Sequence, residues 1–319
     1  MITFENVTKK YADGNTAVDS LSFDIHKGEF FVLIGPSGCG KTTTLKMINR
    51  LIPLTDGTIF IDGKKISEYN IHELRWNIGY VLQQIALFPH MTIEENIAIV
   101  PELKKWDDAT IKDRVTELLD MVGLDPDTYR NRKPSELSGG EQQRVGVVRA
   151  LAADPDIILM DEPFSALDPI SREKLQDDII ALQQNIKKTI VFVTHDMQEA
   201  LKLADRICLM KDGKKVQLGT PTELMEKPAN EFVREFVGNT NKPAVPINLA
   251  DIMQPLTETD PVPTVTLSNS SLSHEILEQL SAHEVVGITE DEQLIGIVNR
   301  QMVIRYFSEH LQERGAING

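Results

Sequence analysis

The sequence predicts an α/β fold, and three observations support this prediction. First, the apolar run Phe30–Ile34 precedes a glycine-rich loop at residues 35–42, and a helical pattern begins directly after that loop. Second, short apolar runs at 156–160 and 189–194 are each followed by charged side chains. Open α/β sheets place their sites at such strand ends. Third, residues 92–135 carry helical spacing between these groups of strands, which predicts a helical insertion.

Length and composition limit the class of protein. The 319 residues suffice for one large domain or two smaller ones. The net charge of −15 argues against direct binding to nucleic acid or to an anionic lipid surface. No apolar run reaches the roughly 18–20 residues of a membrane span, and the first residues do not resemble a secretory signal. With only two cysteines, we expect a reducing, cytosolic compartment and a membrane role only through a partner.

The glycine-rich loop has the spacing of a phosphate-binding loop between a strand and a helix. Glycines let successive backbone N–H groups point into one anion site, and the helix that follows adds the positive end of its dipole. We expect Lys41 to reach the β- and γ-phosphates and the Thr42 hydroxyl to ligate Mg²⁺. A glycine-rich turn that binds nothing is the less favoured reading. The predicted nucleotide-binding residues of the loop are Gly35, Pro36, Ser37, Gly38, Cys39, Gly40, Lys41, Thr42 and Thr43.

The segments before the loop read as strands. Residues 2–7 and 17–25 alternate apolar and polar side chains, as half-buried strands do. Tyr11 lies between them, where a turn is indicated. Its ring could fill the core, or its flat apolar face could stack on an adenine. The sequence leaves both readings open.

Beyond the first helix, residues 56–63 and 78–84 predict two further strands, the second ending in the amides Gln83 and Gln84. Next comes the helical insertion. It is followed by a helix that we expect to begin at Ser138 and to run to about residue 152. Ser138 and Glu141 have the spacing of a capping box.

Two glycines occupy the first turn of this capped helix, although glycine is a poor helix former. Gly139 and Gly140 make sense if a ligand such as a phosphate must approach the backbone closely. A well-capped helix without a ligand is the simpler structural reading.

Two adjacent carboxylates follow the apolar run 156–160. We expect Asp161 to hold Mg²⁺, often through water, and Glu162 to polarise an attacking water. A solvated loop of acids is the less favoured alternative. A phosphate-loop protein needs a metal-binding acid on a neighbouring strand, which supports the functional reading.

The remaining candidates flank the next helix and strand. Asp168 can cap a helix that has Pro169 at its first position. The strand at 189–194 ends at His195, beside the acids and within plausible reach of a γ-phosphate. The other histidines read as ordinary surface or core residues. Residues 207–219 predict a hairpin around an Asp-Gly turn.

Taken together, these segments resemble the ATP-binding subunit of an ABC transporter over about residues 1–238. The matching motifs are Tyr11 as the adenine-stacking aromatic, residues 35–42 as Walker A, Gln83 as the Q-loop glutamine, residues 137–142 as the LSGGQ signature with Glu141 where glutamine is commonest, residues 157–162 as Walker B with its glutamate, residues 165–168 as the D-loop, and His195 as the switch histidine.

The resemblance implies a P-loop NTPase fold of the ABC ATPase type, with a helical subdomain at about 92–140 and an antiparallel β subdomain. It implies ATP and Mg²⁺ as cofactors and a homodimer that sandwiches two ATP molecules. In this reading the catalytic residues are Glu162, His195 and Gln83, the metal-site residues are Thr42, Gln83 and Asp161, the D-loop residue is Asp168, and the signature acting on the second subunit's ATP is Ser138, Gly139, Gly140 and Glu141.

The resemblance also implies partners: transmembrane permease subunits, and a substrate-binding domain or protein reached through the permease. The chain would then sit peripherally at the cytoplasmic face of the cell membrane. Residues 83–91 would lie near the groove that receives a permease helix. Leu87, Phe88 and Met91 could equally belong to the core of the helical insertion.

Three segments look like the branch of importers for osmoprotectants such as glycine betaine, carnitine and choline. These segments are residues 46–51, 83–90 and 194–200. Related importers carry ergothioneine or are implicated in bile tolerance, and both remain alternatives. A soluble ABC ATPase without a transport role usually carries two cassettes or coiled-coil insertions, which this sequence lacks. A phosphate-loop kinase would have no use for the signature helix.

The composition changes near the end of the chain. Prolines and polar residues indicate a linker at 239–248, and residues 249–319 resemble a single CBS motif, a small α+β domain. We expect a short helix at 273–281, paired strands near 285–289 and 293–298, and a closing helix at 301–311. At roughly 70 residues this domain would be marginal alone. It could pair with its copy in the second subunit and bind a regulatory adenine nucleotide or cyclic dinucleotide, or it could only dimerise.

Overall fold

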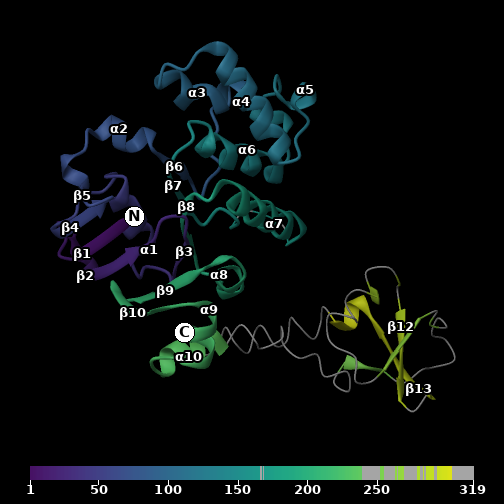
Figure 1. The fold of residues 1–319 in the computed structure, drawn as a ribbon. Coiled ribbons are helices and arrows are strands. Elements are labelled where there is room, and N and C mark those ends of the chain that lie inside the picture. Colours follow the sequence, from purple (N-terminus) through teal and green to yellow (C-terminus); the bar gives the residue numbers. More distant parts are fainter. Residues whose placement is uncertain are drawn as a thin grey trace. The chain divides into compact units, whose positions relative to one another are not determined.

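The chain forms two compact units, residues Met1–Gly238 and Asn239–Gly319. The computed structural model describes residues 1–165, 167, 169–238, 252–254, 263, 265–268, 279–280, 283, 285–290 and 293–303. The linker predicted at 239–248 lies outside the described residues. Figure 1 shows the elements of each unit.

A six-stranded sheet forms the centre of the first unit, with the strand order β10-β9-β3-β8-β7-β6. Neighbouring strands from β9 to β6 run parallel, and only the edge strand β10 is antiparallel to its neighbour. All residues of β3, β7 and β8 are buried, so these strands are near-continuous apolar runs. The α/β prediction is therefore confirmed. The strands are β3 (Phe30–Ile34), β6 (Ile78–Val81), β7 (Ile157–Asp161), β8 (Thr189–Thr194), β9 (Arg206–Lys211) and β10 (Lys214–Gly219).

A second, antiparallel sheet of four strands has the order β2-β1-β4-β5. Phe4 and Phe23 stack on it with ring centroids 4.5 Å apart, and Phe23 stacks in turn on Phe31 of the central sheet at 5.3 Å. Burial of these rings joins the two sheets through one apolar core. The strands are β1 (Ile2–Lys10), β2 (Thr16–Ile25), β4 (Asp56–Ile61) and β5 (Lys64–Lys65).

The predicted helical insertion is also present, beside β6 and β7 (Figure 1). Its first helix begins with a capping box formed by Thr92 and Glu95. Buried aliphatic side chains of these helices continue the core that covers one face of the central sheet. The helices are α3 (Ile93–Leu103), α4 (Asp108–Met121), α5 (Pro126–Tyr129) and α6 (Gly139–Leu151).

The remaining helices of the first unit lie outside the helical insertion, and α9 and α10 are the last elements of that unit. Three of them, α2, α9 and α10, have only six to eight residues and were not predicted from the sequence. Such short helices give little periodic signal. In the described part of the chain, no helix combines the length and the apolar character needed to cross a membrane. These helices are α1 (Lys41–Ile48), α2 (Ile71–Trp76), α7 (Pro169–Ile186), α8 (Met197–Leu203), α9 (Pro221–Glu226) and α10 (Glu231–Gly238).

The second unit contains a small sheet with the order β11-β12-β13. The predicted pairing of the last two strands is confirmed, since β12 (Val285–Glu290) and β13 (Gln293–Asn299) pair antiparallel. The third strand, β11 (Thr266–Ser268), pairs parallel with β12 and was not predicted. Most of the helices predicted at 273–281 and 301–311 lie outside the described residues, apart from helical residues at 279–280 and 301–303.

Candidate functional site

The glycine-rich loop connects β3 to α1 and needs glycine at two positions. Gly40 has φ +99°, and a Cβ atom there would lie 2.2 Å from the carbonyl oxygen of Ala17. A Cβ atom on Gly35 would lie 2.2 Å from the carbonyl oxygen of Met210. Both contacts are far inside van der Waals distance, so no other residue fits without a shift of the backbone. The loop is thus pressed against β2 and β9.

Lys41 is the first residue of α1, and its side chain folds back over the loop. The ammonium Nζ donates hydrogen bonds to the carbonyl oxygens of Gly35 at 2.7 Å and Pro36 at 3.1 Å. Only 5% of Lys41 is exposed. Among the described residues, no carboxylate forms an ion pair with this ammonium group. A phosphate would supply the missing negative charge.

A cavity of about 440 Å³ opens in front of the loop. Its size is within the range of small-molecule and cofactor sites. Tyr11 at its edge is 39% exposed, with Lys9 Nζ 5.0 Å from the centre of the ring. The ring is therefore not core filler, and adenine stacking, the other reading that the sequence left open, stays a prediction. The lining consists of Tyr11, Asn15, Ala17, Ser37, Gly38, Cys39, Gly40, Lys41, Thr42, Thr43, Gln83 and Glu162.

Asp161 ends β7 and approaches the start of α1. Thr42 Oγ1 donates a hydrogen bond to Asp161 Oδ1 at 2.7 Å, and the Tyr80 hydroxyl donates to Oδ2 at 3.3 Å. Burial raises the pKa of Tyr80 well above its usual range, and the negative charge of Asp161 adds to this effect. Asp161 itself is buried. A hydroxyl and a carboxylate oxygen side by side form the hard donor set that Mg²⁺ prefers.

Glu162 is in contact with two further predicted residues. Its Oε2 lies 3.2 Å from His195 Nδ1 and accepts a hydrogen bond from Gln83 Nε2 at 3.3 Å. The backbone of Glu162 has φ +46°, and its N–H donates to the carbonyl oxygen of Val193 at 3.0 Å. A non-glycine residue in this region is strained, and such strain is typical of functional sites. Glu162 thus lies between β7 and β8, next to the cavity.

The predicted capping box at the start of α6 is present. The backbone N–H and the hydroxyl of Ser138 both bond to Glu141 Oε2 at 2.7 Å. The Tyr129 hydroxyl donates to the other carboxylate oxygen at 2.5 Å. These bonds, led by the one from Tyr129, lower the pKa of Glu141 below its usual value. A Cβ atom on Gly139 would meet nothing within 4 Å, so this turn is open on one side.

The turn at residues 138–141, which is the predicted signature, is separate from the cavity at the phosphate loop. Residues 138–141 are not among the lining residues of the cavity. Asp168, the predicted D-loop residue, lies outside the described residues. Next to it, Ser165 Oγ donates to the carbonyl oxygen of Glu162 at 3.0 Å. Within one chain, the predicted site residues that lie together are therefore Tyr11, the loop, Gln83, Asp161, Glu162 and His195. The predicted signature residues are not part of this group.

Cys39 lies within the loop but is buried. Burial raises the pKa of its thiol, which keeps it protonated and unreactive. The expectation that it has no chemical role agrees with this environment.

The segment between β6 and α3 divides its apolar side chains between core and surface. Leu87 is buried, whereas Phe88 is 47% exposed. Buried Asn96 holds the segment in place, because its side chain accepts from the N–H of Phe88 at 2.8 Å and donates to its carbonyl oxygen at 3.1 Å. Leu87 thus belongs to the core, whereas Phe88 lies at the surface.

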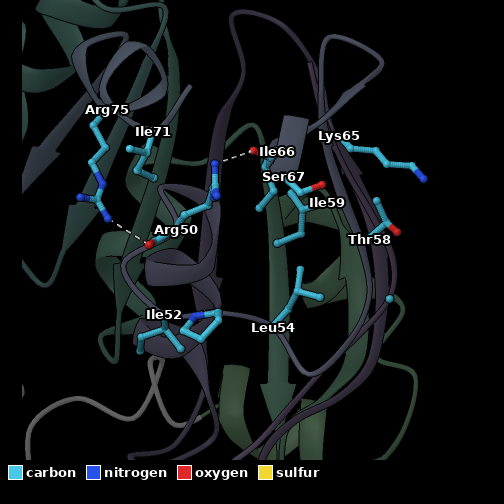
Figure 2. Close-up of a pocket in the computed structure, with 12 residues that line it drawn as sticks. Arg50, Ile52, Leu54, Thr58, Ile59, Lys65, Ile66, Ser67, Ile71 and Arg75 are labelled. Carbon is cyan, nitrogen blue, oxygen red and sulfur yellow. Dashed lines mark hydrogen bonds between the residues drawn. The ribbon is translucent and has the colours of Figure 1, made fainter. Parts of the chain in front are cut away.

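A second cavity lies elsewhere in the first unit. It measures about 640 Å³ and is bounded by the end of α1, by β4 and β5, and by α2 (Figure 2). Arg50 and Arg75 point toward backbone carbonyl groups there: Arg50 Nη1 donates to the carbonyl of Ile66 at 3.2 Å, and Arg75 Nη2 to that of Arg50 at 3.0 Å. These hydrogen bonds connect the segment after α1 to residue 66 and to α2. This cavity shares no lining residue with the phosphate loop.

Two residues of the site were missed in the sequence. Tyr80 contacts Asp161, and Tyr129 contacts Glu141. The sequence did contain a signal that could have placed Tyr80 near Asp161, because β6 and β7 were both predicted as strands that end in polar residues. Their pairing was not predicted, and it is what brings the two side chains together. Nothing in the sequence placed Tyr129, which lies in a helix of four residues.

Comparison with known proteins places the chain among ATP-binding transport proteins. Residues 18–165 match the family model for ABC transporters. The chain is 50% identical to a glycine betaine/carnitine/choline transport ATP-binding protein of Bacillus subtilis, over 95% of this chain and 79% of that protein. It is 48% identical to an osmoprotectant import ATP-binding protein of Salmonella typhimurium, over 94% of this chain and 80% of that protein.

Solved structures agree with this assignment. The fold resembles a dimeric ATP-binding cassette in a post-hydrolysis state bound to ADP and Pi, with a TM-score of 0.63 and 37% sequence identity. The match covers 69% of this chain and 99% of that one. The protein cbiO1 from Clostridium perfringens, part of the ABC transporter complex cbiONQ, matches with a TM-score of 0.66 and 26% identity over 75% of this chain and 93% of that one.

Proposed function

Because the chain belongs to the ATP-binding subunits of ABC transporters, we propose that it powers the import of a quaternary-ammonium-type solute through a membrane permease. The chain is an ABC-type ATPase. The observation that carries the proposal is one connected group of side chains. The phosphate loop, Gln83 and Glu162 line one cavity. Asp161 accepts a hydrogen bond from Thr42 of that loop, and His195 contacts Glu162.

The donor set of the cavity fits a Mg²⁺ complex of ATP. Thr42 and Asp161 would hold the metal, since their oxygen atoms lie 2.7 Å apart, and Gln83 lines the same cavity. When bound, Mg²⁺ supplies positive charge to the β- and γ-phosphates. Lys41 and the loop N–H groups would bind the phosphates, and Tyr11 would stack on the adenine.

In the proposed hydrolysis step, Glu162 orients and polarises the attacking water as a general base. Gln83 and His195 both contact Glu162 Oε2, so they hold this carboxylate in one orientation before the nucleotide arrives. His195 is exposed and follows the end of β8, where it would reach a γ-phosphate. Electrostatic positioning of this kind accounts for most of the catalysis in phosphoryl transfer.

The function requires a second copy of the chain. The signature turn at Ser138 lies outside the cavity of its own chain but has an open face and a helix N-terminus suited to a phosphate. We place Ser138, Gly139, Gly140 and Glu141 against the ATP of the other subunit, with Asp168 also at this interface. Two solved structures of one similar ATP-binding cassette are dimeric. Closure on ATP and opening after hydrolysis would then drive the permease.

The proposed solute follows from the relatives, whose names refer to glycine betaine, carnitine, choline and osmoprotectants. In the same proposal the ATPase sits peripherally at the cytoplasmic face of the membrane, held by the permease, and a substrate-binding domain or protein delivers the solute. Exposed Phe88, five residues after Gln83 in the sequence, would offer an apolar contact for the permease. Importers for ergothioneine or in bile tolerance are alternatives within this branch, and a soluble ABC ATPase is the more distant one.

The second unit is proposed to regulate transport or to dimerise. Its paired strands β12 and β13 and the apolar cluster of Ile252, Val286, Ile288 and Val298 support a small folded domain like a single CBS motif. In this proposal the ATP-binding domain spans 1–238, the linker 239–248 and the regulatory domain 249–319. An adenine nucleotide or cyclic dinucleotide is the proposed ligand.

Isolation of the chain with its partners tests the proposed function. The chain should co-purify from detergent-solubilised membranes with a multi-spanning permease. The complex in proteoliposomes should take up radiolabelled glycine betaine, carnitine or choline only when ATP is enclosed on the side of the ATPase. Purification without any membrane protein would support the soluble alternative. A complex that hydrolyses ATP but transports none of the three solutes would overturn the solute assignment and leave the ATPase assignment intact.

A further inference from the structure

The carboxylate of Asp161 is held from two sides by hydroxyl groups of different elements. Thr42 at the start of α1 donates to Oδ1, and Tyr80 in β6 donates to Oδ2. Asp161 is only 4% exposed, so little water is left to orient it. Each carboxylate oxygen thus has its own protein donor, and together the two bonds fix the plane of the carboxylate.

The sheet register places Tyr80 for this contact. Tyr80 lies opposite Leu159 in the parallel pair of β6 and β7, and Asp161 is two residues beyond Leu159. Because side chains alternate between faces, residues two apart on a strand share a face. Tyr80 and Asp161 therefore project from the same face of the sheet, toward α1. The tyrosine ring packs at the edge of the core beneath the first helix.

We propose that Tyr80 is a positioning residue for the Mg²⁺ site: its hydroxyl orients Asp161 so that the oxygen beside Thr42 faces the metal. This inference rests on the proposed Mg²⁺-ATP site. Tyr80 would not touch the metal or the nucleotide, because its hydroxyl is directed at the far oxygen of Asp161. Its role is to prevent rotation of a carboxylate that would otherwise be held at one oxygen only.

The substitution Tyr80→Phe isolates the hydroxyl, because the ring that packs on the core is kept. Hydrogen bonds to charged groups contribute measurably to binding and stability, and this one is long. We expect Tyr80→Phe to raise the Mn²⁺ concentration for half-saturation of the ATP complex about 3- to 10-fold. Nucleotide binding in the presence of EDTA should stay unchanged, since the loop and Tyr11 do not involve Tyr80.

The test uses the full chain with Glu162→Gln, which blocks hydrolysis, and Mn²⁺ as a paramagnetic substitute for Mg²⁺. The electron paramagnetic resonance signal of free Mn²⁺ is followed during titration in the presence of ATP. Tyr69→Phe is the matched control, because the Tyr69 hydroxyl bonds to the carbonyl oxygen of Ile61 at 2.9 Å, away from the nucleotide cavity. The melting temperature of each variant is measured without nucleotide.

A rise in the half-saturating Mn²⁺ concentration in Tyr80→Phe and none in Tyr69→Phe is the expected result. Equal Mn²⁺ binding in Tyr80→Phe and its parent would overturn the positioning role while leaving the ATP site intact. A parallel loss of metal-free nucleotide binding would also overturn it, because the hydroxyl would then support the fold of the site in general. Failure of the parent itself to bind Mn²⁺ with ATP would overturn the proposed site.

Discussion

His195 Nδ1 lies 3.2 Å from Glu162 Oε2, so the histidine that follows β8 and the acid that follows β7 form one pair. β7 and β8 are neighbouring parallel strands, and their carboxyl ends meet at the same edge of the sheet. The pair is therefore a direct consequence of the strand order. In the proposed mechanism, it brings together Glu162 as the base for water activation and His195 as a partner for the γ-phosphate.

Replacement of Glu162 by glutamine should separate binding from hydrolysis. The amide keeps the size of the side chain but cannot accept a proton from water, so the ATPase rate should fall at least ~10²-fold. ATP binding, measured by equilibrium dialysis with labelled ATP, should remain close to that of the parent chain. Near-normal turnover in Glu162→Gln would remove this residue from the role of general base.

Replacement of Lys41 by alanine should weaken the binding of the triphosphate itself. The lysine ammonium would interact with phosphate in the ground state as well as in the transition state, so the dissociation constant should rise and not only the rate fall. Lys41 also bonds to Gly35 and Pro36, so the melting temperature is measured alongside. An unchanged dissociation constant in a folded variant would show that the lysine does not bind the phosphates.

Substitution of Gly40 should break the loop. A Cβ atom there would lie 2.2 Å from the carbonyl oxygen of Ala17, and φ is +99°. Gly40→Ala should therefore lower the free energy of unfolding by more than about 1 kcal/mol and abolish ATP binding. Gly146→Ala is the control, because this glycine lies inside α6 with open space around its Cβ position. It should stabilise the helix by about 0.5–1 kcal/mol. Equal effects of the two substitutions would contradict the role of Gly40.

Buried Glu199 should make stability fall as the pH rises. Burial raises the pKa of its carboxyl above the usual 4.5, and the negative charge of Asp196 adds to this effect. A hydrogen bond from Thr194 and the charges of Arg172 and His195 oppose it. Above pH 4.5 the folded chain therefore holds a proton that the unfolded chain has lost. The contribution of this group to stability is greatest at low pH and decreases as the pH rises through the raised pKa.

Glu199→Gln should remove this effect, since glutamine still accepts the hydrogen bond from Thr194. The free energy of unfolding, measured by urea denaturation, should exceed that of the parent by more at pH 8 than at pH 4.5. Glu173→Gln, at an exposed position of α7, serves as the control. A difference between Glu199→Gln and the parent that does not change with pH would contradict the prediction.

Much of the fold could be predicted because its signals are local. The phosphate loop needs only its glycines and its flanking apolar run, and the cap at Ser138 needs only Glu141 three residues later. Strands β3, β7 and β8 are apolar throughout because both of their faces are buried. In each case the residues that decide the structure lie within one turn or one strand of each other.

The contacts that complete the site could not be predicted because they depend on long-range packing. Thr42 and Asp161 are 119 residues apart in the sequence and 2.7 Å apart in space. Tyr80 meets Asp161 only through the pairing of β6 with β7. Tyr11 could be assigned to the surface only once its exposure was known. Strand order and register, which fix these contacts, leave no local mark in the sequence.

A structure of the Glu162→Gln chain trapped with ATP and Mg²⁺ tests the shared nucleotide site most directly. If two copies complete each site, the Ser138 hydroxyl of one copy should lie within about 3.2 Å of a γ-phosphate oxygen held by Lys41 of the other. A trapped complex in which Ser138 is remote from every γ-phosphate would contradict the proposed dimer and the transport mechanism that depends on it.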